Sequence, residues 1–160
     1  MIYNNQTFTY DEIGNPLTYR DGMSFTWQAG RQLKSVTFPA ATSSMIYTAT
    51  YKYNKDGLMI EKVLTNNQNS SKTVYTYEYQ GSQLIRQTVN DIVYWFLYDE
   101  SGSPIGLTEN GTVYYYVKNL QGDIVAITNA EGTICSQREF LRNSLERTFH
   151  VLPTNGPLRT

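Results

Sequence analysis

Aromatic and polar residues alternate in short stretches along this chain. Tyr51-Lys52-Tyr53 and Tyr77-Glu78-Tyr79 each place two rings around one charged residue. Because successive side chains of a β-strand point to opposite faces, the two rings lie on one face and the charged residue lies on the other. The pattern therefore predicts half-buried β-strands whose rings bury and whose intervening polar residues stay in water.

A turn signal follows each aromatic stretch. In most copies the second ring is followed by Asp, Asn or Gln, then by a glycine and a small apolar pair. A short polar side chain can bond to nearby backbone and so favours a turn. The glycine adopts the positive φ that a residue with a Cβ resists. A strand, a tight turn and a returning strand predict a β-hairpin.

This phrase occurs six times, with glycines at positions 14, 30, 57, 81, 102 and 122. The spacing settles toward a period of about twenty residues, which is typical of repeat architectures. Further turn signals lie between the copies, at Asp21-Gly22, Asn110-Gly111 and Glu131-Gly132. The repeat-defining positions, for which we expect a structural role, are Tyr10, Asp11, Gly14, Trp27, Gly30, Tyr53, Asn54, Gly57, Tyr79, Gly81, Tyr98, Asp99, Gly102, Tyr116 and Gly122.

These hairpins predict an all-β fold over residues 1–134, in which tandem repeats form a curved or spiralling antiparallel sheet. A single hairpin is marginal in water, but stacked neighbours can join their apolar residues into one continuous seam. The high content of aromatic residues, 14% with fourteen tyrosines, also argues against an all-helical protein.

The period is lost after Ile134, so residues 135–160 are expected to form a non-repeat tail. The spacing of Phe140, Leu141, Leu145 and Phe149 fits one helix face and predicts a short helix over about 137–149. An irregular segment containing Pro153 and Pro157 would follow it.

Charge and hydropathy limit the partners that we expect. The formal net charge is −1 and no Lys/Arg block occurs, so the electrostatic footprint of a nucleic-acid partner is missing. No run of eighteen apolar residues occurs, which argues against membrane insertion. The first ten residues lack the charged and apolar regions of a signal peptide.

The sequence offers few residues for catalysis or metal binding. It contains one histidine, His150, and one cysteine, Cys135, too few to complete a zinc or haem site without several carboxylates. The carboxylates scatter, and many lie in predicted turns. The stretch from Asn54 to Gly57 faintly resembles a calcium loop, but it lacks the distal Glu that such loops need. We therefore expect no catalytic, cofactor-binding or metal-binding residues and no cofactor.

The repeat phrase resembles the YD repeat of the RHS-repeat proteins. The likeness is fullest at Phe8 to Leu17 and at Phe96 to Ile105, and it extends over about residues 8–134. The segment from Tyr114 to Ile134 is similar to the RHS core-associated region of bacterial polymorphic toxins and wall-associated proteins.

The resemblance implies a sheet that closes as a hollow β-shell. In relatives this shell surrounds a C-terminal toxin or effector, or, in the teneurins, forms part of an extracellular adhesion module. The implied partners are the remaining repeats of a larger protein, self-association through open sheet edges, or an encapsulated toxin domain. The implied location is secreted or on the bacterial cell surface. Toxin-bearing relatives have an Asp-Pro cleavage junction, which the tail of this chain lacks.

These observations predict a non-catalytic structural module, part of an RHS/YD-repeat shell, with no enzyme activity of its own. The alternative is a binding module of the cell surface or cell wall that recognises glycan or a partner protein through its aromatic-rich sheet. An enzyme that depends on His150 or on a carboxylate pair ranks third.

Overall fold

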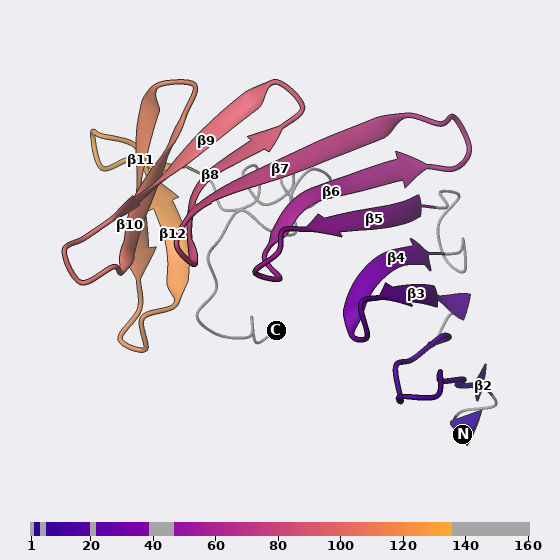
Figure 1. Cartoon of the computed structure of the whole chain (residues 1–160). Coiled ribbons are helices and arrows are strands. Elements are labelled where there is room, and N and C mark those ends of the chain that lie inside the picture. The colour runs from indigo at the N-terminus through magenta and orange to yellow at the C-terminus, as the bar shows by residue number, and fades with distance from the viewer. Residues whose placement is uncertain (1, 4–5, 20–21, 39–46, 136–160) are drawn as a thin grey trace. The chain divides into compact units, whose positions relative to one another are not determined.

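The computed structural model describes residues 2–3, 6–19, 22–38 and 47–135. Within these ranges the regular elements are β-strands, and no α-helix is present (Figure 1). The predicted all-β fold is confirmed. The helix predicted over 137–149 lies outside the described residues, as do Asp21, His150 and the two tail prolines.

The strands are β1 (Ile2–Tyr3), β2 (Gln6–Thr7), β3 (Ser24–Gln28), β4 (Gln32–Phe38), β5 (Tyr47–Tyr53), β6 (Met59–Asn66), β7 (Lys72–Gln80), β8 (Gln83–Val89), β9 (Ile92–Tyr98), β10 (Pro104–Glu109), β11 (Thr112–Lys118), β12 (Ile124–Thr128) and β13 (Ile134–Cys135).

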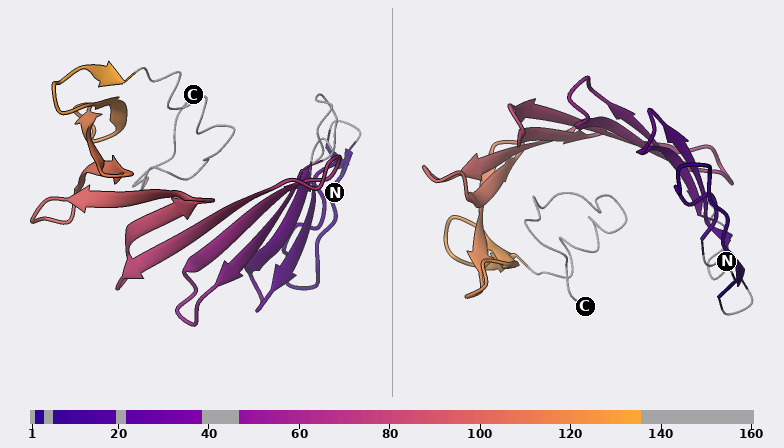
Figure 2. Two further views of the ribbon diagram at one scale, coloured as in Figure 1. Left: turned by 90° about the horizontal axis from the view of Figure 1, so that it is seen from above. Right: turned by 60° about the horizontal axis from the view of Figure 1, so that its bottom comes forward.

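The strands from β3 to β13 follow one another in sequence order in one antiparallel sheet, while β1 and β2 form a separate pair. This is the order that hairpin following hairpin predicts. The chain divides into two compact units, Met1–Thr76 and Tyr77–Thr160, with the boundary inside β7. Figure 2 shows the strands of each unit side by side in this meander.

The apolar core of each unit lies on one face of its strands, which we call the aromatic face. In the first unit it includes Val36, Ala49 and Tyr75, each at most 3% exposed. In the second unit the aromatic face carries the following residues, of which Gln87 and Glu109 are polar: Tyr77, Tyr79, Gln87, Val89, Tyr94, Phe96, Tyr98, Leu107, Glu109, Tyr114, Tyr116 and Ile127. The residues between the rings, such as Lys52, Glu78 and Tyr115, are exposed on the opposite face, as the alternation predicts.

A β-bulge interrupts four of the hairpins just after the turn. The extra residues are Lys34, Ile60, Ile105 and Val125. The last three are each the second member of the apolar pair that follows a repeat glycine. All four are exposed. The expectation that the apolar residues of each copy join one seam is therefore wrong for Ile60, Ile105 and Val125, because an inserted residue breaks the strand alternation.

The first copy differs from the others because its ring does not bury. Tyr10 is 49% exposed and forms only an isolated bridge with Pro16. Its neighbour Phe8 packs against Tyr19, with ring centroids 5.4 Å apart. Among the described residues no repeat precedes this copy, so no neighbouring strand covers the Tyr10 ring.

Candidate functional site

The local geometry that recurs among the repeat copies of this chain is a turn closed by one Asp or Asn side chain. In the fifth copy, Asp99 Oδ1 accepts hydrogen bonds from the backbone N–H groups of Ser101 and Ser103, both at 2.9 Å. The Gly102 N–H donates to the Asp99 carbonyl at 2.9 Å. The same side-chain pattern recurs at Asp11, Asn54 and Asn119. The repeat Asp or Asn is thus a turn-forming residue in these four copies.

Hydrogen bonds to the Asp99 side chain lower its pKa. The Ser101 side chain has the largest effect, followed by the backbone of Ser103, and the charge of Lys118 adds to both. The lowered pKa means that the turn is best formed around an ionised carboxylate.

The second and fourth copies use shorter turns. In the second copy Ala29 and Gly30 have φ of 44° and 82°, and Gln28 pairs directly with Gln32. In the fourth copy Gly81, with φ of 61°, lies in the two-residue connection from β7 to β8. The longer Gln side chain does not take the place of Asp or Asn in closing these turns.

A further turn of the Asp/Asn type lies at Asn129. The Asn129 side chain accepts a bond from the Thr133 N–H at 2.8 Å, and Gly132 N–H donates to the Asn129 carbonyl at 3.1 Å. Glu131-Gly132 was predicted only as an intervening turn, and Thr128 stands immediately before Asn129, where Asp11, Asn54 and Asp99 each follow a tyrosine. The Asn-x-x-Gly spacing was the signal that could have revealed it.

Ring atoms at the end of the aromatic stretch connect consecutive copies. The Tyr53 hydroxyl donates to the Leu33 carbonyl at 3.0 Å, and the Tyr98 hydroxyl donates to the Leu84 carbonyl at 2.6 Å. The indole N–H of Trp27 donates to the Pro16 carbonyl at 2.7 Å. These bonds join each ring to the returning strand or turn of the preceding copy.

In the sixth copy Lys118 takes this position, because it precedes the turn residue Asn119 and pairs with Ile124 beside the bulge. Tyr116 pairs with Ile127 as Phe96 pairs with Leu107, and its buried hydroxyl has no hydrogen-bond partner among the described residues. Burial raises the pKa of Tyr116 above its usual range, and the nearby Tyr98 raises it further. Here the sixth and fifth copies are joined instead by Lys118 Nζ and Ser103 Oγ, 2.6 Å apart.

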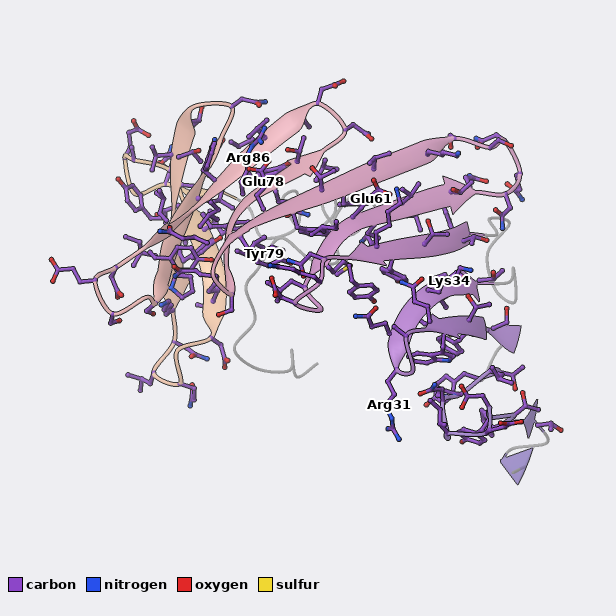
Figure 3. The ribbon with its side chains drawn as sticks, viewed as in Figure 1. Arg31, Lys34, Glu61, Glu78, Tyr79 and Arg86 are labelled. Carbon is purple, nitrogen blue, oxygen red and sulfur yellow. The ribbon has the colours of Figure 1, made fainter. Side chains whose placement is uncertain are left out.

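The remaining predicted positions are placed as follows. The repeat glycines 14, 57, 102 and 122 have φ between 80° and 87°, and each lies in an Asp or Asn turn. Tyr79 is half-buried near the end of β7 (Figure 3), and burial raises its pKa. The structure therefore distributes the predicted positions along a row of turns and strand ends and does not gather them into one cluster.

Two polar residues on the aromatic face were missed by sequence reasoning. Lys62 is 6% exposed and Gln87 is fully buried. Within the described part of the chain, neither the side-chain nitrogen nor the side-chain oxygen of Gln87 has a hydrogen-bond partner. Beside it, the register pairs Gln87 with Tyr94, whose hydroxyl donates to Glu109 Oε1 at 3.2 Å. The sequence signal for the burial of Lys62 and Gln87 was their position in an alternating strand, because each occupies a place where other copies have an apolar residue.

The opposite face carries charged pairs. Lys52 Nζ lies 2.8 Å from Glu61 Oε1. In the second unit Arg86 forms an ion pair with Glu78 (Figure 3), and its guanidinium lies 5.4 Å from the centre of the Trp95 ring. Exposed pairs of this kind contribute little stability each.

No group of three or more His, Cys, Asp or Glu residues suited to a metal ion occurs in the part of the chain that the structure describes. Cys135 is a half-buried free thiol at the end of β13. Within the same part of the chain, no helix is long and apolar enough to cross a membrane.

Three curated bacterial proteins are similar to this chain, and no family model matches it. The tRNA3(Ser)-specific nuclease WapA of Bacillus spizizenii (strain DSM 15029 / JCM 12233 / NBRC 101239 / NRRL B-23049 / TU-B-10) is 30% identical over 140 residues. The tRNA nuclease WapA of Bacillus subtilis (strain 168) is 31% identical over 140 residues. The tRNA(Glu)-specific nuclease WapA of Bacillus subtilis subsp. natto (strain BEST195) is 30% identical over the same length. Each match covers 86% of this chain and 6% of the relative.

These relatives correct the expected function. A non-catalytic structural module without enzyme activity was predicted, whereas the similar proteins are named as nucleases that act on tRNA. The alternative of a glycan-binding or protein-binding surface module has no better support from them. This chain spans only 6% of each relative's length, so the scarcity of catalytic residues within the repeats does not bear on the rest of those proteins. The expected bacterial, toxin-type origin agrees with the three relatives.

Proposed function

We propose that this chain is part of a bacterial tRNA nuclease. The observation that carries the proposal is its 30–31% identity with three tRNA nucleases over 140 residues, most of its length. The similar region includes at least part of the hairpin array, so the proposal concerns the protein to which the array belongs. The proposed substrate class is tRNA.

The test is an RNA cleavage assay on the protein encoded by the complete reading frame. Purified protein is incubated with total bacterial tRNA and, separately, with 5S ribosomal RNA, and the products are resolved on denaturing gels. We expect cleavage of tRNA while 5S RNA stays intact. Intact tRNA, or equal degradation of both RNAs, would contradict a tRNA nuclease. The same assay on residues 1–160 assigns the activity to this segment or to the rest of the protein.

The hairpin array is further proposed to consist of YD repeats of the RHS type. The closed Asp or Asn turns at four of the six predicted copies and again at Asn129 support this proposal, because they repeat one local geometry. β3 is the terminal named strand at this end of the sheet. Among the described residues its outer edge meets only an isolated bridge between Thr18 and Ser24 and a bond from the Phe25 N–H to the Leu17 carbonyl. Backbone groups left unpaired at an edge invite another strand. Further repeats of the same protein, or a second copy, are the proposed partners at this edge.

A secreted or cell-surface location is also proposed, on the strength of the same resemblance. Cell fractionation of the bacterium, with immunoblotting against residues 47–135, would test it. Recovery of the protein only from the cytoplasmic fraction would contradict this location.

A further inference from the structure

Lys62 lies on the aromatic face of the first unit, in the centre of β6. The strand register places it between Tyr51 of β5 and Tyr75 of β7. Its ammonium lies 4.0 Å from the centre of the Tyr75 ring. The residue is 6% exposed, so a positive charge lies on a face formed mainly by rings and aliphatic side chains, whose other polar residues on β6 and β7 include Asn66 and Thr73.

Other lysines show what a paired lysine looks like in this fold. Lys52 is on the neighbouring strand and forms an ion pair with Glu61 on the opposite face. Lys118 donates to the Ser103 hydroxyl. Glu61 is adjacent to Lys62 in sequence, but strand alternation directs its side chain to the other face. Among the described residues no carboxylate forms an ion pair with Lys62.

A buried ammonium without an anionic partner is costly, and ring contact compensates only part of that cost. Burial lowers the pKa of Lys62 to about 8, which agrees with incomplete compensation. Charged residues of this type are almost never buried unless they are paired. The geometry therefore favours a partner that is not one of the described side chains.

We propose that Lys62 is the anchor of an oxyanion-binding site, which takes a single carboxylate or phosphate group between the rings of Tyr51 and Tyr75. An ammonium offers three N–H donors and no acceptor, so it selects an anion and excludes a metal ion. One cation matches one anionic group, and the flanking rings supply apolar contact to whatever carries it. This site is independent of the proposed nuclease function.

Small oxyanions provide the test on the full chain. Protein with 13C-labelled lysine side chains is titrated at pH 7 with sodium phosphate or sodium acetate, while sodium chloride keeps the ionic strength constant. The Lys62 signal is assigned by its absence in Lys62→Met and in Lys62→Arg. We expect this signal to shift and saturate, and anion binding to weaken by about tenfold or more in Lys62→Met, because a charge-assisted hydrogen bond is lost.

Lys52→Met is the matched control, since it removes a lysine from the adjacent strand on the opposite face. It should leave the anion response unchanged, and Lys62→Arg should retain it. Saturation by phosphate alone identifies a phosphate group as the natural ligand, and saturation by acetate alone identifies a carboxylate. The proposal is overturned if the Lys62 signal responds equally to chloride, or if Lys62→Met and wild type bind either anion equally.

Discussion

The Tyr98 hydroxyl donates a hydrogen bond of 2.6 Å to the backbone carbonyl of Leu84. This bond joins β9 of the fifth copy to β8 of the fourth within the second unit. The bond from Tyr53 to Leu33 joins the third copy to the second in the same way. In the sixth copy Lys118 takes this position, and the hydroxyl of Tyr116, which corresponds to Phe96, is buried without a partner among the described residues. Two tyrosine hydroxyls of neighbouring copies therefore have opposite energetic consequences.

Removing these hydroxyls should separate the two cases. We expect Tyr98→Phe to lower the free energy of unfolding by about 1 kcal/mol, because a hydrogen bond is lost and the Leu84 carbonyl loses its partner. Tyr116→Phe should leave stability unchanged or raise it, because it removes a buried hydroxyl that bonds to none of the residues that the structure describes. Urea unfolding followed by circular dichroism measures both. Equal losses in the two variants would contradict the distinction.

Acid stability should depend on Asp99. Its pKa in the folded state is lowered by hydrogen bonds, so the turn contributes stability that is fully present above the unfolded-state pKa of about 3.9. That contribution is lost as the pH falls through the lower folded-state value. Melting temperatures measured between pH 2 and 6 should show a smaller acid-induced decrease in Asp99→Asn than in wild type. Identical pH profiles would show that the turn does not depend on the carboxylate charge.

The buried charge of Lys62 should make the stability of the protein depend on pH in the alkaline range. Its folded-state pKa of about 8 lies below the usual lysine pKa of 10.5, so the unfolded chain binds more protons between these two values. Stability therefore rises with pH in this window, and the penalty of the buried charge is fully present below it. Comparing the melting temperatures of wild type and Lys62→Met from pH 7 to 9.5 isolates this effect, because the tyrosines are common to both. A constant difference between the two would contradict the lowered pKa.

Gly106 should be intolerant of any side chain. A Cβ at this position would lie 2.2 Å from the Tyr114 carbonyl oxygen, whereas at Gly111 nothing lies within 4 Å. We expect Gly106→Ala to cost about 1–3 kcal/mol through steric overlap with backbone. Gly111→Ala, the control in the adjoining turn, should cost about 1 kcal/mol or less through its positive φ alone. Chemical unfolding of both variants measures these losses of unfolding free energy. A larger loss in Gly111→Ala than in Gly106→Ala would contradict the prediction.

Much of the local structure was predictable because it depends on contacts between residues close in sequence. The alternation around Lys52 and Glu78 predicted which side chains stay in water. The spacing of Asp99 and Gly102 predicted a turn, since both the side-chain bonds and the positive φ are local properties. The equivalent turn at Asn129 was not predicted as a repeat copy, because no aromatic residue precedes it, although its Asn-x-x-Gly spacing matches the other turns.

By itself, the sequence determined the β-hairpins, their order and the residues that close their turns, because alternation and turn chemistry act within a few residues. Tertiary structure alone decided that Ile60 and Ile105 are bulged and exposed, that Tyr98 finds an acceptor while Tyr116 does not, and that Lys62 is buried between two rings. These features depend on the register of neighbouring strands, which brings together residues that are distant in sequence.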